Sequence, residues 1–199
     1  MYSTKTASVN NNDFNSSYME VGINTNVELK DVSIEKTPNG KDFIRFTFIK
    51  DNKTVNFTEW KNEKNMWIKT DEDLQKQDDK QFGRLLQLLN CYIKEIPDFE
   101  GNFFIEMINW VKLQLENAMK TTNEKLRLKV IYDKNGYTTV SKYGIYVEPM
   151  SIKDEESQIK LFKNDLMERK IVADKEPETD PLISNNIPET QNGADDLPF

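Results

Sequence analysis

The chain has 199 residues, 37% of them hydrophobic, and a formal net charge of −7, which allows one packed domain with polar tails. It contains no histidine and a single cysteine, which excludes an internal disulfide and argues against the many hydrolases that use histidine as a general base. Because it has neither a run of about 18 apolar residues nor a signal-peptide pattern, we expect a cytoplasmic protein without a membrane partner.

Residues 1–20 are rich in Ser, Asn and Thr, which predicts a flexible N-terminal arm with a short ordered piece near the sequence FNSSYM. The pattern changes at Ile23, where apolar residues begin to alternate with polar ones through NVELKDVSIE. The alternation slips by one residue near Asp31, and such a slip is typical of a β-bulge. We therefore expect a long, bent first strand.

Two further apolar runs, FIRFTFIK and KTVNFTEW, follow the turn sequence TPNG and are separated by the turn residues Asp51 and Asn52. The alternation places one set of side chains in a core: Ile44, Phe46, Phe48, Val55 and Phe57. It places a mixed polar, basic and aromatic set on the outer face: Phe43, Arg45, Thr47, Asn56, Thr58 and Trp60. Three consecutive antiparallel strands result.

The hydrophobic period becomes helical from about residue 71 to residue 120. Thr70 or Asp71 can cap a first helix that ends before Pro97, and FFIEMINWVKLQLENAM forms a second helix with Trp110 on its apolar side. Cys91 lies among apolar residues, so we expect a buried thiol rather than a reactive one.

The chain then returns to strands with LRLKVIYD, an Asn-Gly turn and YTTVSKYGIYVEPM, in which Gly144 marks a bend. Three strands, a helical pair and two strands is the order of a five-stranded OB barrel. We therefore predict a mainly-β fold, with an OB-fold domain at 21–150 and an enlarged helical insertion at about 71–120 between strands three and four. A two-layer α+β sandwich is the alternative.

After this domain, the amphipathic piece at 151–172 predicts a short helix, and residues 173–199 read as a disordered acidic tail. The tail contains seven acidic residues against Lys175, a net charge of −6, whereas residues 1–172 have 26 basic and 27 acidic residues. The body is close to neutral, so only a local basic surface on it can bind phosphates.

Basic and aromatic residues are interleaved on the predicted outer face of the sheet and in the loop that follows the third strand. OB barrels bind single strands through this combination, since cations follow the phosphates and aromatic rings stack on bases. The predicted nucleic-acid-binding residues are Lys41, Phe43, Arg45, Lys50, Trp60, Lys61, Lys64, Trp67, Lys69, Arg127, Lys129, Tyr137, Lys142 and Tyr143. Alternatively, the lysines only solvate the sheet, and the aromatic residues cover the rim of the core or pin the loop that contains Trp60 and Trp67.

Three pairs of carboxylates, Asp71/Asp73, Asp78/Asp79 and Glu155/Glu156, could in principle bind a metal. On helix starts and charged faces, however, such pairs usually stabilise the helix N-terminus or stay solvated. The sequence also lacks a phosphate-binding P-loop and a GxGxxG motif. We therefore expect a protein that is not an enzyme and uses neither a cofactor nor a metal; a carboxylate-dependent nuclease is the weaker alternative.

The chain ends in DDLPF, and here it resembles the single-stranded DNA-binding protein family of bacteria and phages. Members join an OB domain to an acidic tail whose tip has acidic residues, an aliphatic residue, Pro and Phe. The matching positions are Asp195, Asp196, Leu197, Pro198 and Phe199. The resemblance implies that this tip docks replication or recombination partners such as a polymerase, helicase or primase. The large helical segment, short tail and unfamiliar arm point to a divergent, phage-encoded member acting in the bacterial cytoplasm.

The sequence therefore predicts a protein that coats and protects single-stranded DNA during replication, recombination and repair, and that recruits partners through its tip. The alternative is a protein–protein interaction module of OB or sandwich fold whose acidic tail mimics DNA. The resemblance does not extend to the oligomeric state, which the sequence leaves open.

Overall fold

The computed structural model describes residues 17–169. The expected acidic tail at 173–199, with its partner-binding tip at 195–199, and most of the expected N-terminal arm lie outside these residues. The described part is mainly β, and its elements follow the order β1–β3, α1, α2, β4–β6 along the chain. A short 3₁₀ turn, η1 (Asp154–Glu156), comes after the last strand.

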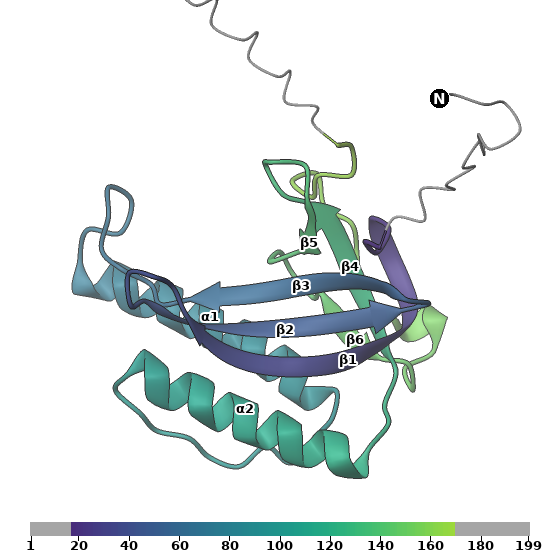
Figure 1. Cartoon of the computed structure of the whole chain (residues 1–199), viewed down its shortest axis with the longest axis horizontal. Helices are drawn as coiled ribbons and strands as arrows, with labels where there is room; N and C mark the ends of the chain where they lie inside the picture. Colours follow the sequence, from purple (N-terminus) through teal and green to yellow (C-terminus); the bar gives the residue numbers. More distant parts are fainter. Residues whose placement is uncertain (1–16, 170–199) are drawn as a thin grey trace, which may run out of the picture.

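The strands form an antiparallel sheet that curls into a nearly closed barrel (Figure 1). Their bounds are β1 (Gly22–Lys36), β2 (Asp42–Lys50), β3 (Lys53–Trp60), β4 (Leu126–Tyr132), β5 (Thr138–Val140) and β6 (Val147–Pro149). Neighbours in the sheet run β3-β2-β1-β4-β5, and β6 pairs with the N-terminal half of β4. Side chains bridge the remaining gap, since Thr139 Oγ1 of β5 donates to the carbonyl oxygen of Asn56 on β3 at 3.4 Å.

β1 is long and bent, as its sequence pattern predicts. Residues 28–36 pair with β2 and residues 22–27 pair with β4, so this one strand contributes to both halves of the barrel. The predicted slip near Asp31 is confirmed as a register shift between Leu29 and Asp31. A second shift lies closer to the N-terminus of the strand, where Asn26 has a positive φ of 58°. These two irregularities let the strand turn the corner of the barrel.

The β2–β3 hairpin turns at Asp51 and Asn52, whose φ values are 49° and 63°. Two consecutive residues in the left-handed region are typical of a two-residue type I′ turn, which matches the twist of the flanking strands. The predicted core face of the hairpin is confirmed, because five of its side chains are buried: Ile44, Phe46, Phe48, Val55 and Phe57. The barrel core therefore lies on the side that the alternation selects.

The last predicted strand is broken into two pieces, β5 and β6, that both lie along β4. The amide of Ser141 donates to the carbonyl oxygen of Lys129 at 3.1 Å, and the amide of Lys129 donates to the carbonyl oxygen of Tyr146 at 2.8 Å. Residues 142–145 consequently loop out between two bonds to the same residue of β4. Gly144, the predicted bend, lies in this loop with a positive φ of 63°.

The helical segment between β3 and β4 forms α1 (Asp71–Asn90) and α2 (Phe104–Thr121); in Figure 1, α1 passes behind the β1–β3 strands and α2 lies below them. Thr70 caps α1, since its hydroxyl oxygen accepts from the amide of Asp73 at 3.0 Å. The buried residues of the helices belong to the same hydrophobic cluster as the strands: Leu85, Leu88, Leu89, Ile108, Val111 and Leu115. Cys91 is also buried, and burial raises the pKa of its thiol to about 12, so it stays protonated.

The short helix expected at 151–172 is not formed within residues 151–169. This segment contains the 3₁₀ turn η1 and otherwise irregular chain, in which Ile159 and Asp165 are buried. The physical reason is a tertiary contact: the carboxylate of Asp165 and the carbonyl oxygen of Lys160 both accept hydrogen bonds from Lys129 on β4. These contacts hold the segment against β4 in an irregular conformation, and this tertiary arrangement overrides the local helical pattern.

The end of the predicted arm is ordered against β3. The amide of Met19 donates to the carbonyl oxygen of Thr54 at 3.0 Å, and the amide of Thr54 donates to the carbonyl oxygen of Ser17 at 2.8 Å. The side chain of Met19 is buried in the core cluster. The folded domain thus begins before residue 21, in the stretch where the sequence indicates a short ordered piece.

Candidate nucleic-acid interface

The outer face of the β2–β3 hairpin presents a stacked aromatic pair. Phe43 and Trp60 are cross-strand partners whose ring centroids lie 4.2 Å apart, and the guanidinium carbon of Arg45 lies 5.3 Å from the centre of the Phe43 ring. Trp60 covers Phe43, which is only 5% exposed, whereas Trp60 itself is 43% exposed. The prediction that Phe43 contacts DNA is therefore corrected: Phe43 supports Trp60, and Trp60 presents the accessible ring.

Trp67 lies in the loop between β3 and α1 and is 83% exposed. Its indole does not pin this loop. The side-chain oxygen of Asn65 accepts hydrogen bonds from the amides of Trp67 at 2.8 Å and Ile68 at 3.1 Å, and these contacts hold the loop instead. The ring is thus available to a ligand at no cost to the fold.

Two tyrosines with exposed rings lie in the turns that precede and follow β5. Tyr137 ends the β4–β5 turn, where its amide donates to the carboxylate of Asp133 at 2.9 Å, and it is 62% exposed. Tyr143 lies in the loop between β5 and β6, where its amide donates to the hydroxyl oxygen of Ser141 at 3.2 Å. Backbone contacts therefore fix both residues while the rings remain accessible.

Three of the six predicted cations on this side of the barrel are paired with carboxylates at the surface. The pairs are Lys41 with Glu63 (2.7 Å), Arg45 with Glu35 (3.0 Å) and Lys64 with Asp71 (2.6 Å). Among the described residues, the side chains of Lys50, Lys61 and Lys69 form no ion pair. Exposed pairs contribute only about 0–1 kcal/mol each, so a phosphate can replace the carboxylate at small cost.

Arg127, a predicted phosphate-binding residue, is buried and unavailable. It is 4% exposed, its guanidinium lies 3.3 Å from the carboxylate of Glu148 on β6, and it also pairs with Asp154 in η1. The segment that follows β6 thus covers the outer side of β4. Glu148 on β6 and Asp154 in η1 together neutralise Arg127.

Lys129 is likewise buried rather than exposed. Its ammonium group lies 3.1 Å from Asp165 Oδ2, donates to the carbonyl oxygens of Tyr143 (2.7 Å) and Lys160 (3.0 Å), and lies 4.5 Å from the centre of the Phe162 ring. Burial opposes ionisation of Asp165, but hydrogen bonds and the charge of Lys129 outweigh it and lower the pKa of this carboxyl group. Lys129 therefore anchors the chain after β6 and cannot reach DNA.

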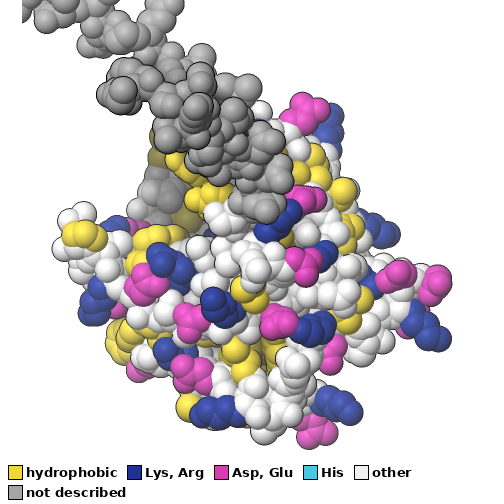
Figure 2. All heavy atoms as spheres, turned by 45° about the vertical axis from the view of Figure 1, so that its right-hand side comes forward, with side chains coloured by type: hydrophobic (Ala, Val, Ile, Leu, Met, Phe, Trp, Pro, Cys, Tyr) yellow, Lys and Arg dark blue, Asp and Glu magenta, His cyan; other side chains and the backbone are white. Residues whose placement is uncertain are grey.

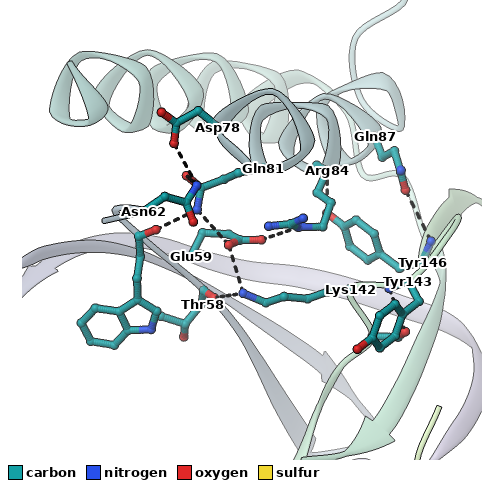
Figure 3. A network of polar contacts seen from close by, with 12 residues as sticks. Thr58, Glu59, Asn62, Asp78, Gln81, Arg84, Gln87, Lys142, Tyr143 and Tyr146 are labelled. Carbon is teal, nitrogen blue, oxygen red and sulfur yellow. Dashed lines mark hydrogen bonds and ion pairs between the residues drawn. The ribbon is translucent and has the colours of Figure 1, made fainter. Parts of the chain in front are cut away.

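A second buried charge, Glu59, joins three parts of the molecule (Figure 3). It is 2% exposed and accepts from Arg84 Nε at 2.6 Å, from Gln81 Nε2 at 3.0 Å and from Lys142 Nζ at 3.0 Å. Burial raises the pKa of Glu59, but the hydrogen bond from Arg84 and the charges of Lys142 and Arg84 reverse this, so the net pKa is lowered. The carboxylate fastens β3 to α1 and to the loop after β5.

This network also fixes the backbone beneath Trp60. Gln81 Nε2 donates to the carbonyl oxygen of Trp60 at 2.8 Å, and Asn62 Nδ2 donates to the carboxylate of Asp78 at 2.9 Å. The predicted site residue Lys142 takes part as well, because its ammonium group donates to the carbonyl oxygen of Thr58 at 3.0 Å. The end of β3 is therefore rigid, and Trp60 is presented in one place.

The sequence analysis did not single out Glu59, although the alternation contains a signal for it. Position 59 shares the core face of β3 with Val55 and Phe57, both of which are buried. A carboxylate at such a position needs a cationic partner, because burying an unpaired charge is costly. Its partner Arg84 lies on a helix that is distant in sequence, so the sequence indicates the need but not the residue.

A pocket of about 590 Å³ lies beside Trp60. The turn between β1 and β2 contributes Lys41, the end of β3 contributes Trp60 and Lys61, and the start of α2 contributes Phe103 and Ile105. Phe103 is 66% exposed and was not a predicted site residue. The pocket combines two accessible rings with two cations and two carboxylates, Asp42 and Glu63, and Glu63 pairs with Lys41. A nucleobase can stack on the rings here if its phosphate replaces Glu63 beside Lys41.

Charge is mixed over the domain rather than collected in one basic channel. Residues 17–169 contain 24 Lys and Arg against 26 Asp and Glu. The face shown in Figure 2 carries basic and acidic side chains side by side. Any nucleic-acid contact must therefore use local cations and exchange some of their carboxylate partners.

The comparisons with known proteins identify no relative: no family model matches the chain, and no curated protein matches its sequence. Within residues 17–169, no helix has both the length and the apolar character needed to cross a membrane. The same residues contain no group of three or more Asp, Glu or Cys side chains arranged to hold a metal ion.

Proposed function

We propose that this chain is a non-enzymatic single-stranded DNA-binding protein that coats and protects DNA during phage replication, recombination and repair. The observation that supports it most directly is Trp60. Its accessible ring is held by Phe43 from below and by Gln81 through its backbone, beside Lys41 and Lys61. A rigid ring between two cations can stack on a base while the lysines contact the flanking phosphates.

The strand order supports assignment of the barrel to the OB fold. Neighbouring strands follow the path β3-β2-β1-β4-β5, and β5 lies next to β3. Around the barrel the strands therefore come in the order β1-β2-β3-β5-β4, with β4 next to β1 again, which is the strand order of an OB fold. OB folds bind oligonucleotides on the face of strands two and three and at the turns between strands one and two and between four and five. Those places correspond here to Trp60, Lys41 and Tyr137. In this assignment α1 and α2 are an enlarged insertion between strands three and four.

The energies are consistent with sequence-tolerant binding. Each stacked base contributes about 1–3 kcal/mol, and the exposed rings include Trp60, Trp67, Phe103, Tyr137 and Tyr143. Replacing a surface carboxylate by a phosphate costs at most about 1 kcal/mol per pair. Stacking of two or three bases therefore outweighs the cost of exchanging the carboxylates, although the domain is nearly neutral.

The C-terminal residues supply the second half of the proposal. The tip DDLPF, which resembles the family's partner-binding end, would recruit a replication or recombination protein such as a polymerase, helicase or primase. Its acidic side chains and its phenylalanine ring suit an apolar pocket with basic residues on the partner. DNA contact by the barrel and partner contact by residues 195–199 would then be separate tasks of one chain.

The test is a titration of a fluorescent oligo-dT at several salt concentrations, followed by fluorescence anisotropy and quenching of tryptophan. We expect log affinity to fall linearly with log salt, by about 0.7 for each phosphate contact. An oligonucleotide that fails to bind at low salt, or an affinity that does not depend on salt, would remove the proposal.

The mixed charge of the surface favours one other candidate, a protein–protein interaction module with a DNA-mimicking tail. Met66, Trp67 and Phe103 are each more than 60% exposed, and exposed apolar side chains are common in protein interfaces. The same titration separates the two functions. A protein-binding module would leave the tryptophan fluorescence unchanged when oligo-dT is added.

A further inference from the structure

A second groove lies away from Trp60, between α1, the loop at 142–145 and the chain after β6. It has a volume of about 700 Å³ and is lined by four cations, Lys80, Arg84, Lys142 and Lys160. Among the residues that the structure describes, no carboxylate lines it. We propose that this groove, here called the α1 groove, binds backbone phosphates of the single strand and extends its path beyond the β2–β3 face. This inference rests on the proposed function.

Glu59 does not cancel the charge of the α1 groove. Arg84 and Lys142 share this single buried carboxylate, so the pair of cations keeps an excess positive charge. Lys80 and Lys160 form no ion pair with any described residue. The groove thus combines four positive charges with one buried negative charge.

Arg84 has donors left for a ligand. Figure 3 shows its guanidinium directed at Glu59, and the bond that fixes it runs from Nε to Glu59 Oε1 at 2.6 Å. Within residues 17–169, its two terminal nitrogens donate to no partner, and they are not buried. A guanidinium held by one nitrogen and open at the other two can contact a phosphate with two donors in fixed geometry.

Gly83 provides an independent observation. A glycine in a helix interior costs about 0.5–1 kcal/mol relative to alanine, so it usually has a packing reason. Here a β-carbon added at Gly83 would meet no heavy atom within 4 Å, so no neighbour requires the glycine. Gly83 lines the α1 groove one position before Arg84. Because Gly83 has no side chain, the backbone of α1 is accessible at the place where the DNA strand would lie.

The α1 groove adjoins the proposed aromatic face, which favours a continuous strand over a separate small anion. Lys142 lines the groove and also donates to the carbonyl oxygen of Thr58 on β3. Its neighbour Tyr143 is 51% exposed. A strand that stacks on Tyr143 can therefore place its next phosphates beside Lys142, Arg84 and Lys80.

The first test compares two double variants of the full chain. Lys80→Ala with Lys160→Ala changes the groove, whereas Lys94→Ala with Lys120→Ala removes two exposed lysines elsewhere and changes the net charge equally. For a 20-nucleotide oligo-dT, the plot of log affinity against log salt concentration should become less steep in the groove variant by about 1.4, or about 0.7 for each lysine removed. Its affinity at 0.1 M salt should fall on the order of 20-fold. The control variant should retain the slope of the unmodified chain.

The second test uses Gly83, where new side chains have room. Gly83→Glu places a carboxylate in the α1 groove, and Gly83→Gln is a control of the same size without charge. We expect the Glu variant to bind oligo-dT several-fold more weakly than the Gln variant at low salt, with a difference that shrinks as salt is added.

The outcomes distinguish two failures. Binding by the unmodified chain, with groove and control variants equal in slope and affinity and with Gly83→Glu equal to Gly83→Gln, would overturn the α1 groove but leave the proposed function standing. Absence of binding by the unmodified chain would overturn both.

Discussion

The outer sides of β2 and β4 have the same sequence pattern, but the outer side of β2 is exposed to solvent and that of β4 is buried. Arg45 on β2 and Lys129 on β4 both alternate with apolar residues that face the core. Arg45 remains partly exposed and pairs with Glu35, whereas Lys129 is buried against Asp165. The difference comes from residues 151–169, which cover β4 and leave β2 open. Alternation therefore tells on which side of a strand a cation lies, but not whether that side meets water.

The largest expected effect tests this contrast through stability. Asp165→Ala removes the partner of a fully buried ammonium group, and breaking a buried pair costs about 3–5 kcal/mol. Glu35→Ala removes the partner of Arg45, whose side chain is 38% exposed, and should cost less than about 1 kcal/mol. Urea denaturation followed by circular dichroism measures both changes. Equal losses in the two variants would contradict the contrast between the strands.

Glu59→Gln should have the next largest effect. It leaves Arg84 and Lys142 without their shared charge, but these side chains are 19% and 43% exposed and regain some hydration. We expect a loss of about 2–3 kcal/mol, below that of a fully buried pair. Lys76→Gln, which removes an exposed partner of Glu72 on α1, is the matched control and should change stability by less than about 0.5 kcal/mol.

The same variant gives the pH dependence. The pKa of Glu59 is lowered from its usual value of 4.5, so the folded state holds the ionised form more strongly than the unfolded chain does. Its stabilising contribution is complete above about pH 5 and is lost as pH falls through the lowered folded pKa. The free energy of unfolding should therefore fall less steeply below pH 5 in Glu59→Gln than in the unmodified chain. Parallel curves would show that Glu59 titrates normally.

Features set by local chemistry were predictable from sequence, and features set by distant contacts were not. The bulge near Asp31, the turn at Asp51 and the core face with Phe46 follow from alternation and turn residues, and the structure confirms them. Burial of Lys129 depends on Asp165, which is 36 positions away. No local pattern reveals that contact, because the segment containing Asp165 reads as an amphipathic helix.

Prediction was limited in the same way at the candidate site. The sequence offered Trp60 and Trp67 either as DNA-binding rings or as rings that pack the loop and the rim of the core, and the structure shows both rings exposed. The sequence did not indicate which of Trp60 and Phe43 is exposed and which is buried, because either of two aromatic residues on one face can cover the other. It also missed Arg84, which reads as an ordinary helix residue until α1 places it beside Glu59.

Trp60→Ala tests whether the open side of the hairpin binds DNA. Loss of one stacked base should weaken oligo-dT binding by about 1–3 kcal/mol, which is roughly 5- to 150-fold. The variant also uncovers Phe43, so Trp60→Leu, which retains apolar cover, separates the loss of stacking from the loss of packing. Fluorescence anisotropy measures the affinities. Full affinity in both variants would return Trp60 to a packing role.

Deletion of residues 173–199 should have a smaller effect with the opposite sign. The removed segment has a net charge of −6, so it can compete with DNA for exposed cations such as Lys61 and Lys69, but not for buried Lys129. We expect a chain ending at Val172 to bind oligo-dT several-fold more tightly at low salt and equally at high salt. An affinity gain that persists at high salt would point to a cause other than charge.

Trp67→Ala should have the smallest effect on the fold and so gives the cleanest measurement of stacking. Asn65 holds the loop, and the ring is 83% exposed, so stability should change by less than about 0.5 kcal/mol. If the ring stacks on a base, affinity for oligo-dT should fall by about 1 kcal/mol, the lower end of the range for one base, because the loop must also be ordered on binding. Met66→Ala changes a neighbour that is also largely exposed but has no ring, and it should leave affinity unchanged. If Trp67→Ala and Met66→Ala bind oligo-dT equally well, the Trp67 ring does not stack on a base. Stacking would then be restricted to Trp60 at the end of β3, and the binding surface would be the open side of β2 and β3 alone.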